Sequence, residues 1–204
     1  PRLPLILIPT TAGTGSEVTP ISIVTTGETT KTGIVSPILY ADVAILDANF
    51  TTGLPPHITA ATGIDAMVHA IEAYTSKIKK NFYADMLAKQ ALTLLNKNLK
   101  KVLKDGSDLT ARQDMLLGSM LAGQAFANAP VGAVHALAYP LGGHFHISHG
   151  HSNALVLLEV LKFNAPEAKQ YYAELMQWLD PFSKGSTNGL CDLFIDHMQN
   201  HLTN

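Results

Sequence analysis

The hydrophobic pattern divides the chain into a short strand-forming part and a longer helical part. Residues 3–9 are a continuous apolar run closed by proline, which predicts a short buried strand. The β-branched residues of 21–25 and 34–35 flank a polar turn and predict a hairpin. Residues 40–47 predict one more strand, whereas the small polar residues of 10–19 predict a loop.

A proline pair at positions 55–56 separates these strands from the helical part. Thr59 or Thr62 is expected to cap a helix that continues through residue 76 with its apolar residues on one stripe. Leucine and alanine recur at helical period over residues 82–103, and Gly106 follows as a stop signal. Further helices are expected after Asp108 or Thr110, and over residues 134–141, 152–161, 165–178 and 190–202.

The pattern as a whole predicts a mainly α fold in which a β-rich segment precedes an all-helical domain. We place the boundary between residues 53 and 54, so that the two parts are 1–53 and 54–204. Composition supports folded parts, since 47% of the residues are hydrophobic and only 15% are charged.

Charge, cysteine content and hydropathy indicate which kinds of partner and cellular compartment to expect. A net charge of -2 leaves no basic excess to neutralise phosphates, so no nucleic-acid partner is expected. The single cysteine, Cys191, excludes an intramolecular disulfide, is expected to be buried, and fits a reducing compartment. No apolar run approaches the roughly 20 residues of a membrane-spanning helix. No signal segment opens the chain, so a cytoplasmic protein without a membrane partner is expected.

The histidines are the first indication of chemistry, because five of the nine lie between His135 and His151. Asp65 and His69 are one helical turn apart, so both side chains project from the same helix face. His135 and His149 are candidates for the remaining ligands of a metal ion. Three imidazoles and one carboxylate suit Fe(II) or Zn(II) better than Ca(II) or Mg(II). The alternative is a chance pairing, because helical histidines are often packed or exposed side chains.

Three segments resemble the iron-containing alcohol dehydrogenase family: residues 9–19 (PTTAGTGSEVT), 63–74 (GIDAMVHAIEAY) and 135–157 (HALAYPLGG…SHGHSNALVL). They follow one another in the family's order. The resemblance implies the helical metal-binding domain of a dehydroquinate synthase-like fold, preceded by a small β-rich remnant of the α/β nucleotide-binding domain. The chain is then expected to be a fragment. The metal ligands implied by position are Asp65, His69, His135 and His149.

The same resemblance implies NAD(H) or NADP(H) as cofactor. Residues 10–19 resemble the family's nucleotide-contacting loop, and threonine hydroxyls beside glycine can approach a pyrophosphate. Without the resemblance this would be an ordinary polar loop, since it contains no G-x-G-x-x-G motif. The cofactor-binding residues implied are Thr10, Thr11, Gly13, Thr14 and Thr19 from the loop, and Lys31, which resembles a ribose-contacting lysine.

The activity implied is metal-assisted hydride transfer between a small alcohol or aldehyde and the nicotinamide. Some members of the family carry a histidine, near the reacting carbon, where this chain has Tyr139. A nearby side chain or water is therefore expected to relay the proton, and for the three histidines among the candidates a loop or packing role is the more common one. The candidates are Tyr139, His144, His146 and His151.

Other functions remain open at this point. A hydroxyacid–oxoacid transhydrogenase or a glycerol dehydrogenase-like enzyme has related chemistry. A zinc hydrolase would need a carboxylate base, as in H-E-x-x-H, and Glu72 is assigned instead to helix packing or capping. An inactive, truncated metal-binding helical module is the alternative from another class. Homo-oligomers are common in the family that the chain resembles.

Overall fold

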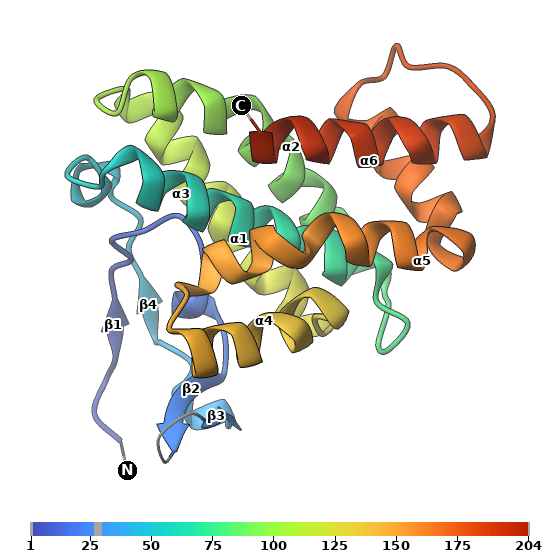
Figure 1. Ribbon diagram of the computed structural model, residues 1–204. Coiled ribbons are helices and arrows are strands. Elements are labelled where there is room, and N and C mark those ends of the chain that lie inside the picture. The colour runs from blue at the N-terminus through green and yellow to red at the C-terminus, as the bar shows by residue number, and fades with distance from the viewer. Residues whose placement is uncertain (1, 27–29, 204) are drawn as a thin grey trace.

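The computed structural model describes residues 2–26 and 30–203, in which a small β region precedes a helical body (Figure 1). The helices are α1 (Pro56–Thr75), α2 (Phe82–Lys104), α3 (Leu109–Asn128), α4 (Ala133–Phe145), α5 (His149–Leu179) and α6 (Thr187–Thr203). The mainly α fold expected from the sequence is confirmed. Helix α1 contacts α2, α3 and α5, and it therefore supplies much of the core.

Helix α1 begins earlier than its threonines suggest. Pro56 occupies the first helical turn, where its missing N–H costs nothing and its fixed φ favours the helix. The expectation that Thr59 or Thr62 caps this helix is wrong, because both lie inside it. The Thr62 hydroxyl donates instead to the Ile58 carbonyl oxygen at 2.9 Å. From residue 63 to residue 74 the helix is buried on every side, because other helices surround it.

Side-chain caps fix the starts of the next two helices. Asn81 Oδ1 accepts a hydrogen bond from Ala84 N at 2.9 Å, and Asp108 Oδ1 accepts one from Ala111 N at 2.9 Å. Each cap satisfies a backbone N–H that the helix itself leaves unpaired. The expected start of a helix at Asp108 is confirmed.

Helix α5 is continuous over 31 residues, where the sequence pattern predicts two helices. Pro166 lies inside it, on the exposed side. An interior proline removes one backbone hydrogen bond and costs about 3 kcal/mol. Leu161 and Ala168, on either side of the proline, are both buried in the core. Packing on both sides keeps the helix intact, and the predicted break is wrong.

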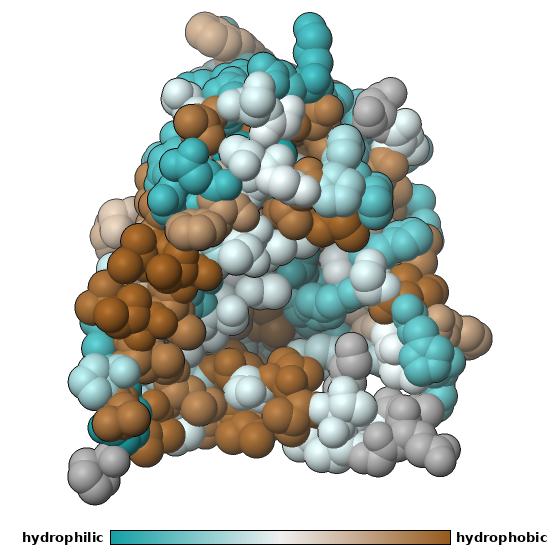
Figure 2. Space-filling model, turned by 90° about the vertical axis from the view of Figure 1, so that its left-hand side faces the viewer, coloured by the Kyte–Doolittle hydropathy of each residue, from teal (hydrophilic) through white to brown (hydrophobic). Residues whose placement is uncertain are grey.

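The strands form two small sheets: parallel β1 (Ile6–Leu7) with β4 (Val43–Ala44), and antiparallel β2 (Ile21–Thr26) with β3 (Thr30–Val35). The predicted hairpin is confirmed. The first strand is much shorter than expected, and its predicted burial is wrong. Ile6 and Ile8 are 57% and 44% exposed, since no described element covers them. The face of the molecule that carries β1 and β4 shows apolar patches around a hollow (Figure 2).

The sequence also led to expectations about Cys191, membrane-spanning helices and the domain boundary. Cys191 is buried within α6, as expected. Among the described residues, no helix has both the length and the apolar character that a membrane crossing requires. The domain boundary between residues 53 and 54 stays a prediction; it falls just before α1.

Two histidines tie α6 to α2. His197 Nε2 and His201 Nε2 lie 2.6 and 2.7 Å from Asn96 Oδ1, so both neutral imidazoles donate to one oxygen. Burial lowers the pKa of both histidines, that of His201 to about 4, and the nearby Lys100 lowers both further. The neutral forms therefore hold this helix contact together.

Acid should weaken this contact. In the unfolded chain His201 gains a proton below its ordinary pKa of 6.5, whereas in the folded chain it stays neutral down to about 4. The free energy of unfolding should therefore fall by on the order of 1 kcal/mol as the pH falls through this window, after allowance for partial exposure. Urea unfolding at about pH 7 and about pH 5 should show a smaller loss for His201→Gln than for the unchanged protein. Equal losses would contradict the role given to His201.

Candidate metal centre

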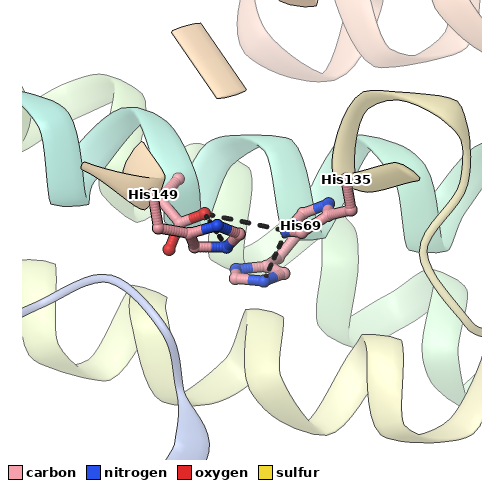
Figure 3. A group of neighbouring side chains, drawn as sticks. His69, His135 and His149 are labelled. Atoms are coloured by element: carbon pink, nitrogen blue, oxygen red, sulfur yellow. Dashed lines mark hydrogen bonds and ion pairs between the residues drawn. The ribbon is translucent and has the colours of Figure 1, made fainter. Parts of the chain in front are cut away.

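The four expected ligands come together at one point. Asp65 and His69 project from α1, His135 from α4, and His149 is the first residue of α5. Their ligand atoms all lie within 4.8 Å of one another. Figure 3 shows the three labelled imidazoles turned toward one another. The shared face of Asp65 and His69, expected from their spacing, is confirmed.

The separations fit the coordination shell of a small divalent ion. His69 Nε2 lies 2.9 Å from His135 Nε2, and Asp65 Oδ1 lies 3.7 Å from His135 Nε2 and 3.4 Å from His149 Nε2. Ligands placed about 2.1 Å from one ion stand roughly 3 to 4 Å apart. Asp65, His69 and His135 are buried, whereas the side chain of His149 is 33% exposed. The site is therefore closed on the α1 side and accessible near His149.

A close helix contact brings His149 to the site. A Cβ atom on Gly150 would lie 2.2 Å from the Ala61 carbonyl oxygen, so the start of α5 rests directly on the backbone of α1. Only glycine allows this approach. The contact holds His149 opposite Asp65, one turn further along α1.

Glu72 holds His135 in place, a role that the sequence did not reveal. Its Oε1 accepts a hydrogen bond from Val134 N at 2.7 Å, and its Oε2 lies 2.7 Å from His135 Nδ1. The assignment of Glu72 to helix capping is confirmed at the start of α4. Because His135 Nδ1 donates to the carboxylate, the neutral imidazole carries its lone pair on Nε2, the nitrogen that faces the other ligands. The available signal was spacing: Glu72 follows His69 by three residues on one helix face.

The charges of the cluster also suit a cation. Burial raises the pKa of Asp65, but His69, His135 and His149 together lower it, so this carboxylate is ionised. Burial lowers the pKa of His69 to about 4 despite the nearby Asp65 carboxylate. For His135, burial also favours the neutral form, but Asp65 and Glu72 outweigh it and raise the pKa to about 9. Two ring nitrogens 2.9 Å apart cannot both present lone pairs to each other, so one of them carries a proton unless a metal ion takes its place.

Asn153 is a further residue of the centre that sequence reasoning missed. It is fully buried on α5, and its Nδ2 donates to Asp65 Oδ1 at 2.6 Å. The same nitrogen lies 3.3 Å from His135 Nε2 and 3.4 Å from His149 Nε2. Asn153 follows His149 by one helical turn, which was the only signal in the sequence. Its amide orients the one carboxylate among the four ligands.

Asn153→Ala is expected to weaken divalent-metal binding by about 10- to 100-fold, because Asp65 loses the donor that orients it. Competition against a chelator would measure the dissociation constants for Fe(II) and Zn(II). Leu155→Ala is the matched control, since this leucine is 54% exposed on the same helix. An unchanged metal affinity in Asn153→Ala would show that Asn153 only fills space.

A cleft of about 370 Å³ opens beside the cluster. Three of the four expected metal ligands form part of its wall, and the rest comes from the 10–19 loop, β2, α3, α4 and the connection between these two helices. The lining residues are Thr14, Ser16, Thr19, Ile21, Ile23, Thr25, His69, Phe126, Val131, His135, Tyr139 and His149. A ligand in this cleft would therefore touch both the metal-facing histidines and the polar loop.

Only part of the expected cofactor-binding set lines this cleft. Thr14 and Thr19 do, whereas Thr10, Thr11 and Gly13 do not. Gly13 instead allows the loop to pack on α1, because a Cβ atom there would lie 2.8 Å from Thr62 Cβ. The backbone of Lys31 pairs with Thr25 in the hairpin, but its side chain lies outside the described part of the structure. The nucleotide contacts stay a prediction.

Of the four proton-relay candidates, the structure brings only Tyr139 to the cleft. Its ring lies parallel to that of His149, with centroids 6.1 Å apart, and burial raises its pKa. His144, His146 and His151 are exposed, and none of them lines the cleft. The reason is the end of α4 at Phe145, which leaves these histidines on the surface around the turn into α5.

The sequence of the chain matches a known protein family in two segments. Residues 1–48 match the family described as iron-containing alcohol dehydrogenase, and residues 59–194 match the C-terminal domain of the same family. The chain belongs to the iron-containing alcohol dehydrogenases. The fold and the resemblance expected from the sequence are thereby confirmed.

Several relatives within this family are similar over most of the chain. Long-chain-alcohol dehydrogenase 1 of Geobacillus thermodenitrificans is 51% identical over 177 residues, which cover 87% of this chain and 44% of that protein. The 4-hydroxybutyrate dehydrogenase of Clostridium kluyveri is 44% identical over 161 residues, 78% of this chain and 43% of that protein. The chain thus spans less than half the length of these relatives.

Solved structures of related proteins share the fold of this chain. The crystal structure of a 1,3-propanediol oxidoreductase superposes with a TM-score of 0.94 at 39% identity, covering 98% of this chain and 53% of that one. A sulfoacetaldehyde reductase from Bifidobacterium kashiwanohense, solved with NAD+, gives a TM-score of 0.83 at 31% identity, covering 100% of this chain and 53% of that one. The family therefore includes proteins named for quite different alcohols and aldehydes.

Proposed function

We propose that this chain is the metal-binding part of an NAD(P)-dependent oxidoreductase that interconverts small alcohols and aldehydes. The convergence of Asp65, His69, His135 and His149 beside a cleft carries the proposal. Membership of the iron-containing alcohol dehydrogenases supports it. We assign residues 1–53 to the nucleotide-binding domain and residues 54–204 to the metal-binding domain.

The four side chains would hold Fe(II), with Zn(II) as the alternative, since imidazole and carboxylate ligands suit both ions. A bound ion would supply Lewis-acid polarisation of the substrate oxygen. Glu72 and Asn153 would keep His135 and Asp65 in the ligating orientation. The open side at His149 faces the cleft, which is where a substrate can approach.

The nucleotide would bind on the loop side of the same cleft. Thr14 and Thr19 offer hydroxyls there, and NAD(H) or NADP(H) needs such donors and acceptors for its ribose and pyrophosphate. Tyr139 is the proton-relay group that we favour, because burial keeps its phenol protonated beside His149. We further propose a cytoplasmic enzyme with no nucleic-acid or membrane partner, since the single cysteine suits a reducing compartment.

The test is metal-dependent turnover. Purified protein stripped with a chelator should form no NADH from NAD+ and 1-butanol, and Fe(II) added back should restore the rise in NADH absorbance. Equal rates with and without metal would contradict a metal-dependent dehydrogenase. A cofactor that stays bound and is reduced only once per protein would indicate a transhydrogenase instead.

A further inference from the structure

We propose that a second metal ion binds between α6 and α2, at His197, His201 and Asn96, and that this ion is a transition-metal dication such as Zn(II). The site is separate from the cluster around Asp65, because none of its three residues lines the cleft beside that cluster. It is expected to join two helices rather than to act on a substrate. The inference therefore does not depend on the proposed dehydrogenase activity.

The two histidines come from one face of α6. His197 and His201 are four residues apart in this helix, so their side chains lie one turn apart on the same side. The same spacing holds zinc in the helical H-E-x-x-H motif, where both histidines are ligands. Here the ring centroids are 5.1 Å apart and the interplanar angle is 66°. One rigid helix thus supplies two imidazole ligands.

Asn96 on α2 brings an oxygen to the same point. Its Oδ1 lies 2.6 Å from His197 Nε2 and 2.7 Å from His201 Nε2, so three donor atoms converge. Ligands of one bound ion stand roughly 3 to 4 Å apart, so these side chains must separate slightly to admit a metal. The nitrogens of the first cluster are similarly close, since His69 Nε2 and His135 Nε2 lie 2.9 Å apart. All three residues of the second site are partly exposed, which allows water to complete the coordination.

The chemistry of the donors selects the ion. Two imidazoles with one amide oxygen suit Zn(II), Ni(II) or Cu(II), whereas Ca(II) and Mg(II) prefer shells made of oxygen. A ligating imidazole must be neutral, and burial lowers the pKa of both histidines. Coordination through Nε2 moves the remaining ring proton to Nδ1. In His201 that atom has no hydrogen-bond partner among the described residues, so the proton can move there without breaking another bond.

Two charged side chains near the site act in opposite directions. The Lys100 ammonium lies near both histidines and repels a cation, whereas the Asp180 carboxylate lies near His197 and attracts one. Because Lys100 is exposed, water and salt screen its repulsion. Lys100→Gln removes the repulsion and keeps all three ligands. It should therefore tighten zinc binding at this site by about two- to fivefold.

The test is a zinc titration of chelator-stripped protein at about pH 7, followed with a coloured competing chelator. The cluster around Asp65 is the same in every variant, so the comparison isolates the second site. His201→Gln should weaken binding of one zinc ion by at least about 10-fold, because it removes a direct ligand. His57→Gln is the matched control, since His57 is exposed on α1. It should bind zinc as the unchanged protein does. Equal zinc binding by His201→Gln and the unchanged protein would overturn the inference.

Two further measurements hold even if His201→Gln does not fold. In the unchanged protein, the imidazole proton NMR signals of His197 and His201 should shift on addition of zinc, while those of His57 stay in place. Imidazole signals of the pair that do not move would overturn the inference. Lys100→Gln should bind this zinc ion more tightly than the unchanged protein, and weaker or equal binding would also contradict the site.

Discussion

Replacing Asp65 with asparagine should abolish tight divalent-metal binding and lower alcohol oxidation by at least about 1,000-fold, because the loss of the metal removes several kcal/mol of charge stabilisation. Asp65 supplies the only carboxylate among the four ligands, and its side chain is almost completely buried. An amide of the same shape keeps the packing but removes the negative charge. Metal content after dialysis and the rate of NADH formation would measure both effects.

Asp192→Asn is the control for this substitution. Asp192 is exposed on α6, which contributes no ligand to the cluster, so metal content and rate should remain at the level of the unchanged protein. Retention of the metal and of activity in Asp65→Asn would show that the cluster is not the metal centre.

Gly150→Ala should lower the free energy of unfolding by about 3 kcal/mol, because the new methyl group forces packed backbones apart. Its Cβ would stand 2.2 Å from the Ala61 carbonyl oxygen, and no side-chain rotation relieves a contact with backbone. Separation of α5 from α1 would also move His149 and Asn153 away from Asp65. Weaker metal binding should therefore accompany the loss of stability, as measured by urea unfolding and by chelator competition.

Gly189→Ala provides the matched control within a helix. The nearest atom to a Cβ at Gly189 is Ser186 Oγ at 3.5 Å, which is ordinary contact. Alanine is the better helix former, so this variant should be neutral or slightly more stable. Equal destabilisation of the two variants would show that the close contact of Gly150 with α1 is unimportant.

The helix boundaries show how far local signals reach. Asn81 and Asp108 cap their helices through hydrogen bonds to residues three positions on, and such signals can be recognised in the sequence. Thr59 and Thr62 resemble caps equally well, but the helix had already begun at Pro56. Pro166 resembles a break, yet α5 continues because residues on both sides of it pack in the core. Such outcomes depend on packing that a local pattern does not contain.

At the metal centre, too, local sequence signals identified some residues and missed others. The spacing of Asp65 and His69 was sufficient to place both on one helix face, whereas the choice of His135 and His149 among nine histidines depended on the family resemblance. Glu72 and Asn153 were missed. Both follow a ligand at helical spacing, but acidic and amide residues occur at such spacings in most helices without any role at a site.

The sequence by itself determined the mainly α architecture, the hairpin, most helix boundaries and the family, because these follow from patterns within a few residues or from recognisable motifs. Only the tertiary structure decided which faces meet. The approach of α5 to α1 at Gly150, the contact of Glu72 with His135, and the lining of the cleft each join residues from different elements. Side-chain packing between distant segments sets those contacts, and no local periodicity encodes it.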